Sequence, residues 1–212
     1  METIGQPGQQ AGLGVREVHI GHADLRKSLL RRPPAQLRQQ RLLLFGVPLP
    51  SAIHLSILET RTHHWPNEAA CAVTAAALAK RQGLANAYIE LHGPLGAGKT
   101  TFVRHLLHAL GVQGRVKSPT YAVMEPYELV RDGAPFSIWH FDFYRFNDPQ
   151  EWEDAGFRDV FASVGLKLAE WPEKAEGLLP VADLRIHIDP LADDSREVRF
   201  VARTPLGLEL LA

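Results

Sequence analysis

Eight consecutive residues, Gly93 to Thr100, combine glycines, one lysine and one hydroxyl side chain at fixed spacing. They read Gly-Pro-Leu-Gly-Ala-Gly-Lys-Thr and match the pattern G-x-x-x-x-G-K-[ST] at every fixed position. Glycine lets a backbone wrap closely around a phosphate, so that several N–H groups point inward. Lys99 supplies a positive charge to the outer phosphates, and the Thr100 hydroxyl is suited to bind magnesium. The pattern therefore predicts a loop that binds ATP or GTP together with Mg²⁺.

The residues on either side of this loop predict the elements that must hold it. Ala87–His92 is a short apolar run typical of a buried strand, and Thr100–Leu110 is helical in pattern and ends before Gly111. A strand before and a helix after is the context that a phosphate loop requires. The positive N-terminal end of the helix adds to phosphate binding. A further helix, Ala69–Arg81, precedes the strand and has Asn67 as its expected N-cap.

Two acidic residues follow apolar strand patterns. Asp142 comes after Ser137–Phe141, and Glu170 comes after Leu166–Ala169. Ligands bind at the carboxyl ends of strands in open α/β sheets, so both carboxylates can converge on the nucleotide. There they would hold magnesium or orient the attacking water. The alternative is that each acid only caps the helix or turn that follows it.

Two further features stand where a nucleotide-dependent contact is expected. Ser118–Tyr121 lies between the predicted loop helix and the next strand, the usual place of a switch segment that senses the γ-phosphate. Arg145 is a candidate for stabilising charge in the transition state, or equally a surface ion-pair partner.

Composition narrows the class of protein. The 212 residues are 45% hydrophobic and 22% charged, with 23 basic and 24 acidic side chains and a net charge of −1. This balance gives no support to a protein held to nucleic acid mainly by phosphate neutralisation. A single cysteine excludes an intrachain disulfide, and no apolar run reaches the roughly 18 residues of a membrane span. We therefore expect a cytoplasmic location and no membrane contact.

The element pattern predicts an α/β domain of the P-loop nucleoside triphosphate hydrolase type, with a mostly parallel central sheet flanked by helices. Two strands around the turn at residues 131–134 and a closing hairpin, Leu184–Ile188 with Glu197–Ala202, complete it. One helix is expected over Asp148–Phe157. Residues 1–62 read as an extension that is partly disordered, because Met1–Gly14 is rich in Gly and Gln, and residues 63–212 read as the ATPase domain.

Several longer segments resemble one protein family in their residues, order and spacing. The matching segments are Gly96–Arg104, Val116–Tyr121, His140–Arg145, Asp148–Glu151, Glu170–Glu173 and Leu179–Pro180. Together they resemble TsaE (also called YjeE), the small bacterial ATPase of tRNA threonylcarbamoyladenosine synthesis. The resemblance covers about residues 65 to 205. The Lys-Ser-Pro-Thr, His-x-Asp-x-Tyr-Arg and Glu-Trp-Pro elements are together far more specific than the phosphate loop alone.

The resemblance implies a function and a set of partners. Proteins of this family hydrolyse ATP slowly by themselves and act with TsaD and TsaB. These subunits transfer a threonylcarbamoyl group to the adenosine beside the tRNA anticodon, so tRNA would be reached only indirectly through the complex. ATP and Mg²⁺ are the implied cofactors.

The resemblance also implies site residues. Thr100 and Glu170 would bind magnesium, and Asp142 and Glu170 would be the catalytic acids, with Asp142 activating or positioning the water. The implied nucleotide-binding residues are Gly96, Ala97, Gly98, Lys99, Thr100, Thr101, Thr120, Cys71 and Arg196. Cys71 stands where the family usually has a threonine that touches the nucleotide, and a thiol is a weaker hydrogen-bonding partner. Residues 1–60 have no family counterpart.

A small-molecule P-loop kinase of the uridine-kinase type is the alternative enzyme. Asp142-Phe143-Tyr144 resembles the acid-aromatic stretch that positions an acceptor hydroxyl in such kinases. They usually carry an arginine-rich lid, and no such cluster occurs between Gly156 and Leu179. A second alternative is a nucleotide-gated binding module whose hydrolysis only times its assembly with partners.

Overall fold

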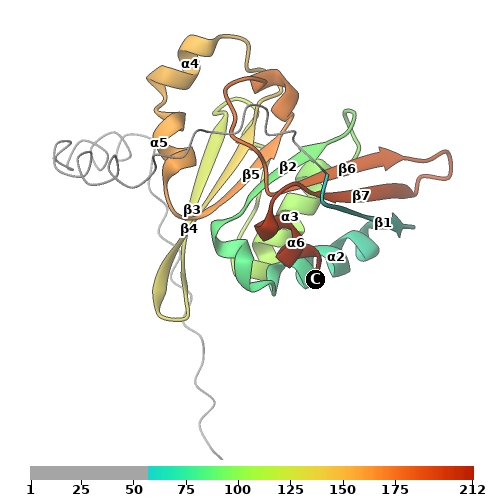
Figure 1. Ribbon diagram of the computed structural model, residues 1–212. Helices are drawn as coiled ribbons and strands as arrows, with labels where there is room; N and C mark the ends of the chain where they lie inside the picture. The colour runs from blue at the N-terminus through green and yellow to red at the C-terminus, as the bar shows by residue number, and fades with distance from the viewer. Residues whose placement is uncertain (1–56) are drawn as a thin grey trace, which may run out of the picture.

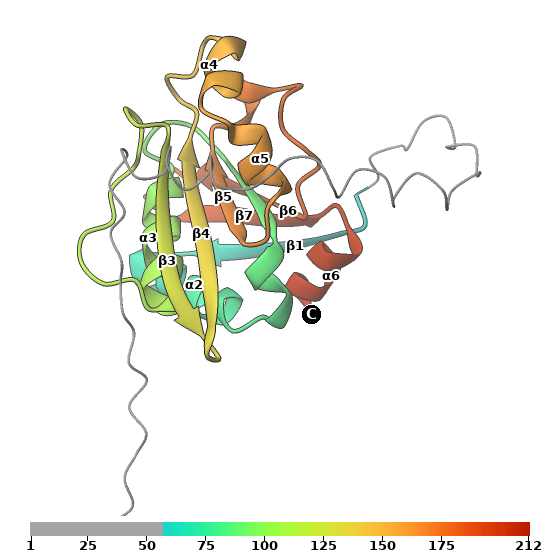
Figure 2. The same cartoon turned by 90° about the vertical axis from the view of Figure 1, so that its left-hand side faces the viewer.

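A seven-stranded sheet forms the centre of the molecule (Figures 1 and 2), as seen in a computed structural model that describes residues 57–212. Its strands are β1 (Glu59–Trp65), β2 (Tyr88–His92), β3 (Met124–Arg131), β4 (Ala134–Asp142), β5 (Leu166–Glu170), β6 (Leu184–Pro190) and β7 (Arg196–Ala202). They lie in the order β1-β7-β6-β2-β5-β4-β3. The strand that precedes the glycine-rich loop, β2, is therefore at the middle of the sheet.

The sheet is mixed, which corrects the prediction of a mostly parallel one. The central pairings β6–β2, β2–β5 and β5–β4 are parallel. The outer pairings β1–β7, β7–β6 and β4–β3 are antiparallel. The two hairpins that the sequence predicted, β3–β4 and β6–β7, account for two of the antiparallel pairings, because tight turns can only join antiparallel strands.

Helices cover both faces of this sheet. They are α2 (Glu68–Ala79), α3 (Lys99–Leu110), α4 (Pro149–Asp154), α5 (Phe157–Ala162) and α6 (Pro205–Leu211), with short 3-10 helices η1 (Gln82–Asn86) and η2 (Pro172–Ala175). In Figure 1, α2 and α3 lie on one side of the sheet and α4 and α5 on the other. None of the helices within residues 57–212 is both long and apolar enough to cross a bilayer.

The core divides into two layers because side chains alternate along each strand. Ile89 and Leu91 of β2 face α2 and α3 within the larger apolar cluster. Tyr88, which points the other way, packs with Phe141 and Phe157 in the cluster beneath α4 and α5. Both faces of β2 are thus buried, and the loop that follows it starts from a rigid base.

Local signals set most element boundaries. The Asn67 side chain accepts a hydrogen bond from the backbone N–H of Ala70 at 3.1 Å and begins α2, as predicted. The helix expected over Asp148–Phe157 is α4, which already ends at Asp154, because Gly156 adopts a left-handed conformation (φ 68°) before α5 begins at Phe157. A left-handed residue cannot continue an α-helix, so the chain turns there.

Three of these helices and strands were not predicted, β1, α5 and α6, and neither were the 3-10 helices η1 and η2. β1 is an edge strand whose residues 60–64 are exposed, so it lacks the apolar alternation by which a strand is recognised. It begins at Glu59, whereas the domain was expected to begin at residue 63. Residues 1–56 of the expected extension lie outside the described residues.

Candidate functional site

The glycine-rich loop joins β2 to α3, as the sequence predicted. Gly93 has φ 139°, and a Cβ atom there would lie 2.4 Å from the carbonyl oxygen of Ile188 in β6. Gly98 is the left-handed N-cap of α3 (φ 110°). Both positions exclude a side chain, the first by contact and the second by conformation. The loop is therefore pressed against the neighbouring strand and leads directly into the helix N-terminus.

Lys99, the first residue of α3, is buried and folds back over the loop. Its Nζ donates hydrogen bonds to the carbonyl oxygens of Gly93 (2.7 Å) and Pro94 (3.0 Å), and lies 3.8 Å from the centroid of the Trp171 ring. Burial lowers the pKa of Lys99, and the nearby carboxylates, Glu170 foremost, offset part of that effect. The ammonium group is thus held by neutral acceptors and an aromatic face rather than by a bonded carboxylate.

Asp142 and Glu170 lie side by side at the carboxyl ends of β4 and β5, where they form a register pair of the parallel ladder. Both carboxylates are buried. The Thr100 hydroxyl donates a hydrogen bond to Oε2 of Glu170 at 2.8 Å. The structure therefore brings together the two residues proposed as magnesium ligands, which lie 70 positions apart in the chain. A site at the carboxyl ends of strands is expected to do so.

His140 is a site residue that the sequence analysis did not select. It is fully buried, and its Nε2 lies 2.8 Å from Oε1 of Glu170, the oxygen that Thr100 does not contact. Its Nδ1 has no hydrogen-bond partner among residues 57–212. A histidine that holds a carboxylate in this way fixes the orientation of the carboxylate as a ligand. The available signal was its spacing of two from Asp142, which places both on one face of β4.

The predicted switch segment closes over Asp142. The Thr120 hydroxyl donates to Oδ2 of Asp142 at 2.6 Å, and the Ser118 hydroxyl donates to the same oxygen. The backbone N–H of Tyr144 donates to Oδ1 at 2.9 Å. Every oxygen of Asp142 is thus engaged, and two of its three partners come from the segment that joins α3 to β3.

These side chains surround a hollow of about 270 Å³ in front of the loop. Its lining includes residues 95–101, Thr120, Asp142 and Glu170, which the sequence predicted, together with Tyr144 and Trp171. The rings of Tyr144 and Trp171 lie 5.0 Å apart between centroids. Trp171 has φ 57°, an uncommon conformation for a residue with a bulky side chain, and it turns the chain sharply after Glu170.

A smaller hollow of about 170 Å³ lies on the other side of the loop, lined in part by residues 96–98 and Thr101. Cys71 and Arg196, both predicted as nucleotide contacts, line it together with Trp65. Burial, and secondarily the charge of Glu68, raise the pKa of Cys71 to about 12, so the group present is the thiol. Nε of Arg196 donates to the carbonyl oxygen of Ala97 at 2.9 Å, which ties β7 to the loop.

Arg145 is not among the residues that line either hollow. Its guanidinium lies over the ring of Tyr121, 4.5 Å from the centroid. Among residues 57–212, no group of three or more His, Cys, Asp or Glu side chains forms a metal-binding cluster.

Comparison with known proteins places these features in a family. The family described as "Threonylcarbamoyl adenosine biosynthesis protein TsaE" matches residues 65–198. The tRNA threonylcarbamoyladenosine biosynthesis protein TsaE of Haemophilus influenzae is 45% identical over 124 residues, which is 58% of this chain and 75% of that protein. The Bacillus subtilis protein of the same name is 40% identical over 114 residues, 54% of this chain and 68% of that protein.

A solved structure agrees with the sequence matches. The crystal structure of Bacillus subtilis YdiB superposes with a TM-score of 0.56 and 28% identity, covering 72% of this chain and 92% of that chain. The matched region includes the glycine-rich loop, both acids and His140. The chain belongs to the TsaE family.

Proposed function

We propose that this chain is a Mg²⁺-dependent P-loop ATPase that acts in the formation of threonylcarbamoyladenosine in tRNA, the process named for its relatives. The observation that carries the proposal is the hydrogen bond from Thr100, at the start of α3, to Glu170, beside Asp142. A hydroxyl and a carboxylate meeting at a helix N-terminus behind a glycine loop are the groups that bind a nucleotide–magnesium complex.

The residues present fit such a ligand. Backbone N–H groups of the loop and the Lys99 ammonium bind the phosphates, for which the 270 Å³ hollow in front of the loop provides the space. Thr100 and Glu170 would hold the magnesium ion, which would neutralise charge on the outer phosphates. His140 keeps the Glu170 carboxylate in place. Asp142 orients the attacking water.

Binding of ATP would change several of the contacts described above. Lys99 exchanges the carbonyl oxygens of Gly93 and Pro94 for phosphate oxygens, a charge-assisted and stronger interaction. Ser118 and Thr120 leave the Asp142 carboxylate, which frees it to accept a hydrogen bond from water. Hydrolysis is then slow in the isolated protein, because these groups must first exchange partners and because Arg145 lies away from the hollow.

The smaller hollow receives the nucleoside part of ATP. Cys71 and Arg196 line it, and Trp65 provides an aromatic wall. Trp65 is held in place by stacking on Phe102 (5.6 Å between centroids) and by a hydrogen bond from its Nε1 to Thr74 (2.9 Å). A rigid apolar wall beside a few polar groups is the usual composition of a small-molecule pocket.

TsaD and TsaB are the partners in this proposal, and ATP hydrolysis times the assembly with them. The comparisons give the kinase alternative no support, since the curated relatives found are named TsaE. The Thr120 hydroxyl of the switch segment is hydrogen-bonded to Asp142. Such a contact can transmit the nucleotide state to a partner protein that binds the segment.

The test combines turnover with restoration of the modification. ATP turnover of residues 57–212 is measured alone and with TsaD and TsaB, and the same fragment is expressed in a bacterium depleted of TsaE. A fragment starting at residue 63 is unsuitable, because it would remove half of β1. We expect slow turnover, stimulation by the partners and restored threonylcarbamoyladenosine in tRNA. Lys99→Ala, expected to weaken ATP binding about ten- to a hundred-fold, is the negative control. Full-length protein that binds ATP without restoring the modification would contradict the proposed role.

A further inference from the structure

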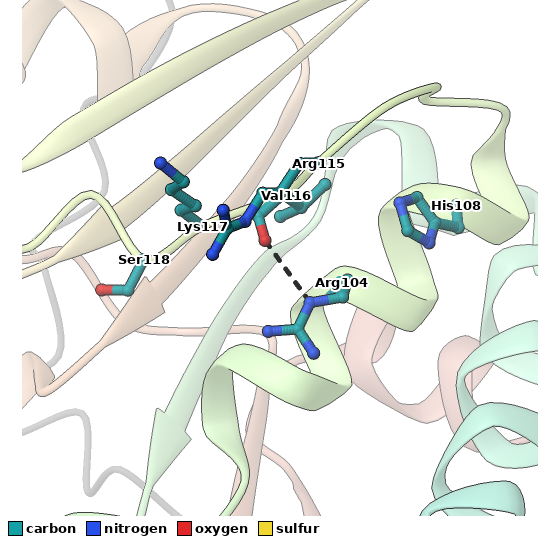
Figure 3. A pocket seen from close by; sticks show the side chains of 6 residues that line it. All are labelled: Arg104, His108, Arg115, Val116, Lys117 and Ser118. Carbon is teal, nitrogen blue, oxygen red and sulfur yellow. Dashed lines mark hydrogen bonds between the residues drawn. The ribbon is translucent and has the colours of Figure 1, made fainter.

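A basic hollow lies beside the nucleotide site but outside it. It measures about 520 Å³ and is lined by Arg104, His108, Arg115, Val116, Lys117 and Ser118. Figure 3 shows Arg104 and His108 on successive turns of α3, facing the segment that carries the other four residues. Arg104 Nε donates to the carbonyl oxygen of Val116 at 3.4 Å, the bond drawn in the figure. Two separate elements thus place their cationic side chains around one concavity.

The positive charge of this basic hollow is uncompensated within the described residues. No carboxylate of residues 57–212 lies within 4.0 Å of Arg104, Arg115 or Lys117. Other surface arginines do have such partners, for example Arg158 with Glu153 at 2.5 Å. Like charges gathered without counter-ions repel one another. A ligand that brings negative charge would remove this repulsion.

The basic hollow shares a residue with the nucleotide site. Ser118 lines both, and its hydroxyl donates to Asp142. On its far side the hollow continues, through Arg115, Lys117 and Ser118, into a second concavity of about 620 Å³ that reaches Tyr121. A movement of Ser118 that follows nucleotide binding therefore also moves the wall of the basic hollow.

We propose that the basic hollow docks a carboxylate-rich segment of the partner protein and couples that docking to the nucleotide state. The coupling rests on the proposed function, since it requires an ATP site at Asp142. Arginine guanidinium groups bind carboxylates in a bidentate manner, and Arg104 and Arg115 offer two. Tyr121 is 85% exposed with Arg145 over its ring, and exposed tyrosines and arginines are the residues enriched in protein interfaces.

The surroundings favour a protein over an RNA strand. Glu125 lines the adjoining concavity, so a phosphate backbone leaving the basic hollow in that direction would meet a carboxylate. The chain as a whole has a net charge of −1, whereas proteins that bind nucleic acid through phosphates usually have a basic excess. A compact group of cations with an acidic neighbour matches the mixed charges of a protein surface.

The experiment measures binding of the full chain to a purified TsaD–TsaB complex in the presence of a non-hydrolysable ATP analogue. Arg115→Glu is the main variant, because Arg115 is exposed and its side chain makes no hydrogen bond or ion pair within residues 57–212. We expect about tenfold weaker partner binding at low salt and a smaller effect at about 0.15 M salt. Arg104→Gln should weaken binding in the same direction. Lys80→Glu, the same charge reversal at an exposed site outside the hollow, should stay within about twofold.

The outcomes separate this inference from the proposed function. Arg115→Glu alone should bind the ATP analogue as the wild type does, and a loss of partner binding with unchanged nucleotide binding supports the inference. Wild-type protein that binds both ATP and the partner, together with an Arg115→Glu variant of unchanged partner affinity, would overturn the inference and leave the ATPase standing. Loss of binding to an anticodon stem-loop RNA, with partner binding unchanged, would also overturn it, in favour of RNA. Wild-type protein that does not bind ATP would refute the proposed function itself.

Discussion

Two groups of buried polar side chains lie on opposite faces of the sheet, and their charges are compensated differently. The site cluster (Thr100, His140, Asp142 and Glu170) lies on the face covered by α3. The β2–β6 cluster (Tyr88, Glu90, His92, Arg185 and His187) lies on the other face, since side chains alternate along β2. Both clusters contain a buried carboxylate at the middle of the sheet.

The β2–β6 cluster is complete in itself. Glu90 accepts hydrogen bonds from Arg185 Nε (2.6 Å) and the Tyr88 hydroxyl (3.2 Å), and lies 3.1 Å from His92 Nε2. Burial raises the pKa of Glu90, but the hydrogen bond with His92 and the charge of Arg185 outweigh it, so the pKa is lowered overall. A buried charge with three fixed partners stabilises one arrangement of the backbone.

The charges of the site cluster are held by loop hydroxyls and backbone carbonyl oxygens, which a ligand could replace. The hydroxyls on Asp142 come from a loop segment, Lys99 is bonded to carbonyl oxygens of its own loop, and His140 Nδ1 has no partner within residues 57–212. Buried polar groups held by groups that can move are ready to bind a ligand. The comparison teaches that burial alone does not identify a functional charge, whereas the kind of partner that holds it does.

The strongest test of the difference between the two clusters is to neutralise Asp142. Asp142→Asn keeps the shape of the side chain but removes the carboxylate that we propose orients water, so ATP turnover should fall about 10²–10⁴-fold. Thermal unfolding should change little, because the partners of Asp142 are exchangeable. Turnover is followed by phosphate release in the presence of TsaD and TsaB. Full partner-stimulated activity in this variant would make Asp142 structural.

His140 tests whether the site cluster depends on orientation. His140→Gln should raise the magnesium concentration for half-maximal turnover about 10–100-fold, the usual effect of losing a group that orients a metal ligand. Turnover at saturating magnesium should recover much of its wild-type value, which a general loss of structure would not allow. His105→Gln, a change on α3 of a histidine paired with Glu68 at 2.9 Å, is the matched control. An unshifted magnesium titration would remove His140 from the site.

The β2–β6 cluster should respond in stability rather than in activity. Arg185→Met leaves the buried Glu90 without its closest charged partner and should lower the free energy of unfolding by about 1–3 kcal/mol. Arg199→Met breaks the exposed pair with Asp189 (3.3 Å) and should cost less than about 1 kcal/mol. Urea denaturation measures both. The comparison fails if Arg185→Met leaves stability unchanged and lowers turnover instead.

The dependence of stability on pH is a further test of the β2–β6 cluster. Burial lowers the pKa of His187 from 6.5 to about 4, assisted by the charges of His92, Arg199 and Arg185 and opposed by Asp189. The unfolded chain therefore takes up a proton near pH 6.5 that the folded chain does not take up until about pH 4, so stability falls as pH falls through this window. For a half-buried side chain we expect a loss on the order of 1–2 kcal/mol. His187→Gln should flatten the profile of unfolding midpoint against pH, and an unchanged slope would assign the effect elsewhere.

The smallest expected effect concerns the smaller hollow, which is lined by Cys71 and Arg196. Cys71→Thr introduces the threonine that the family resemblance implies at this position, and a hydroxyl is a stronger hydrogen-bonding group than a thiol. ATP affinity should increase about two- to ten-fold, equivalent to one ordinary hydrogen bond of about 0.5–1.5 kcal/mol. Titration with a fluorescent ATP analogue measures it, with Cys71→Ala as the control for loss of the thiol. Equal affinity of all three proteins would show that this side chain does not touch the nucleotide.

The sequence predicted those parts of the fold that depend on local signals. Asn67 begins α2 and Gly111 ends α3, because capping is decided within a few residues. β6 and β7 pair as predicted because both alternate and a short turn joins them. Gly156 was overlooked as a break because the apolar pattern continues across it, and β1 because an edge strand buries little.

The sequence named most of the residues that the structure brings together around the glycine loop, but not the contacts between them. Lys99 and Thr100 could be predicted because they occupy fixed positions in the pattern of the glycine loop. The adjacency of Asp142 and Glu170 depends on the register of two parallel strands, which no local pattern sets. His140 was missed for the same reason. Its contact with the Glu170 carboxylate depends on the pairing of β4 with β5, which the sequence of β4 alone does not show.

The pairing of β1 with β7 along its whole length has a consequence for synthesis of the chain on the ribosome. β1 leaves the ribosome first among the strands, and its partner follows roughly ten seconds or more later at ordinary elongation rates. β5 and β6, the two neighbours of β2, are made within that interval, whereas Arg196, which holds Ala97, is made only with β7 itself. The hydrogen bond from Arg196 to Ala97, which ties the glycine loop to β7, can therefore form only after β7 has been synthesised.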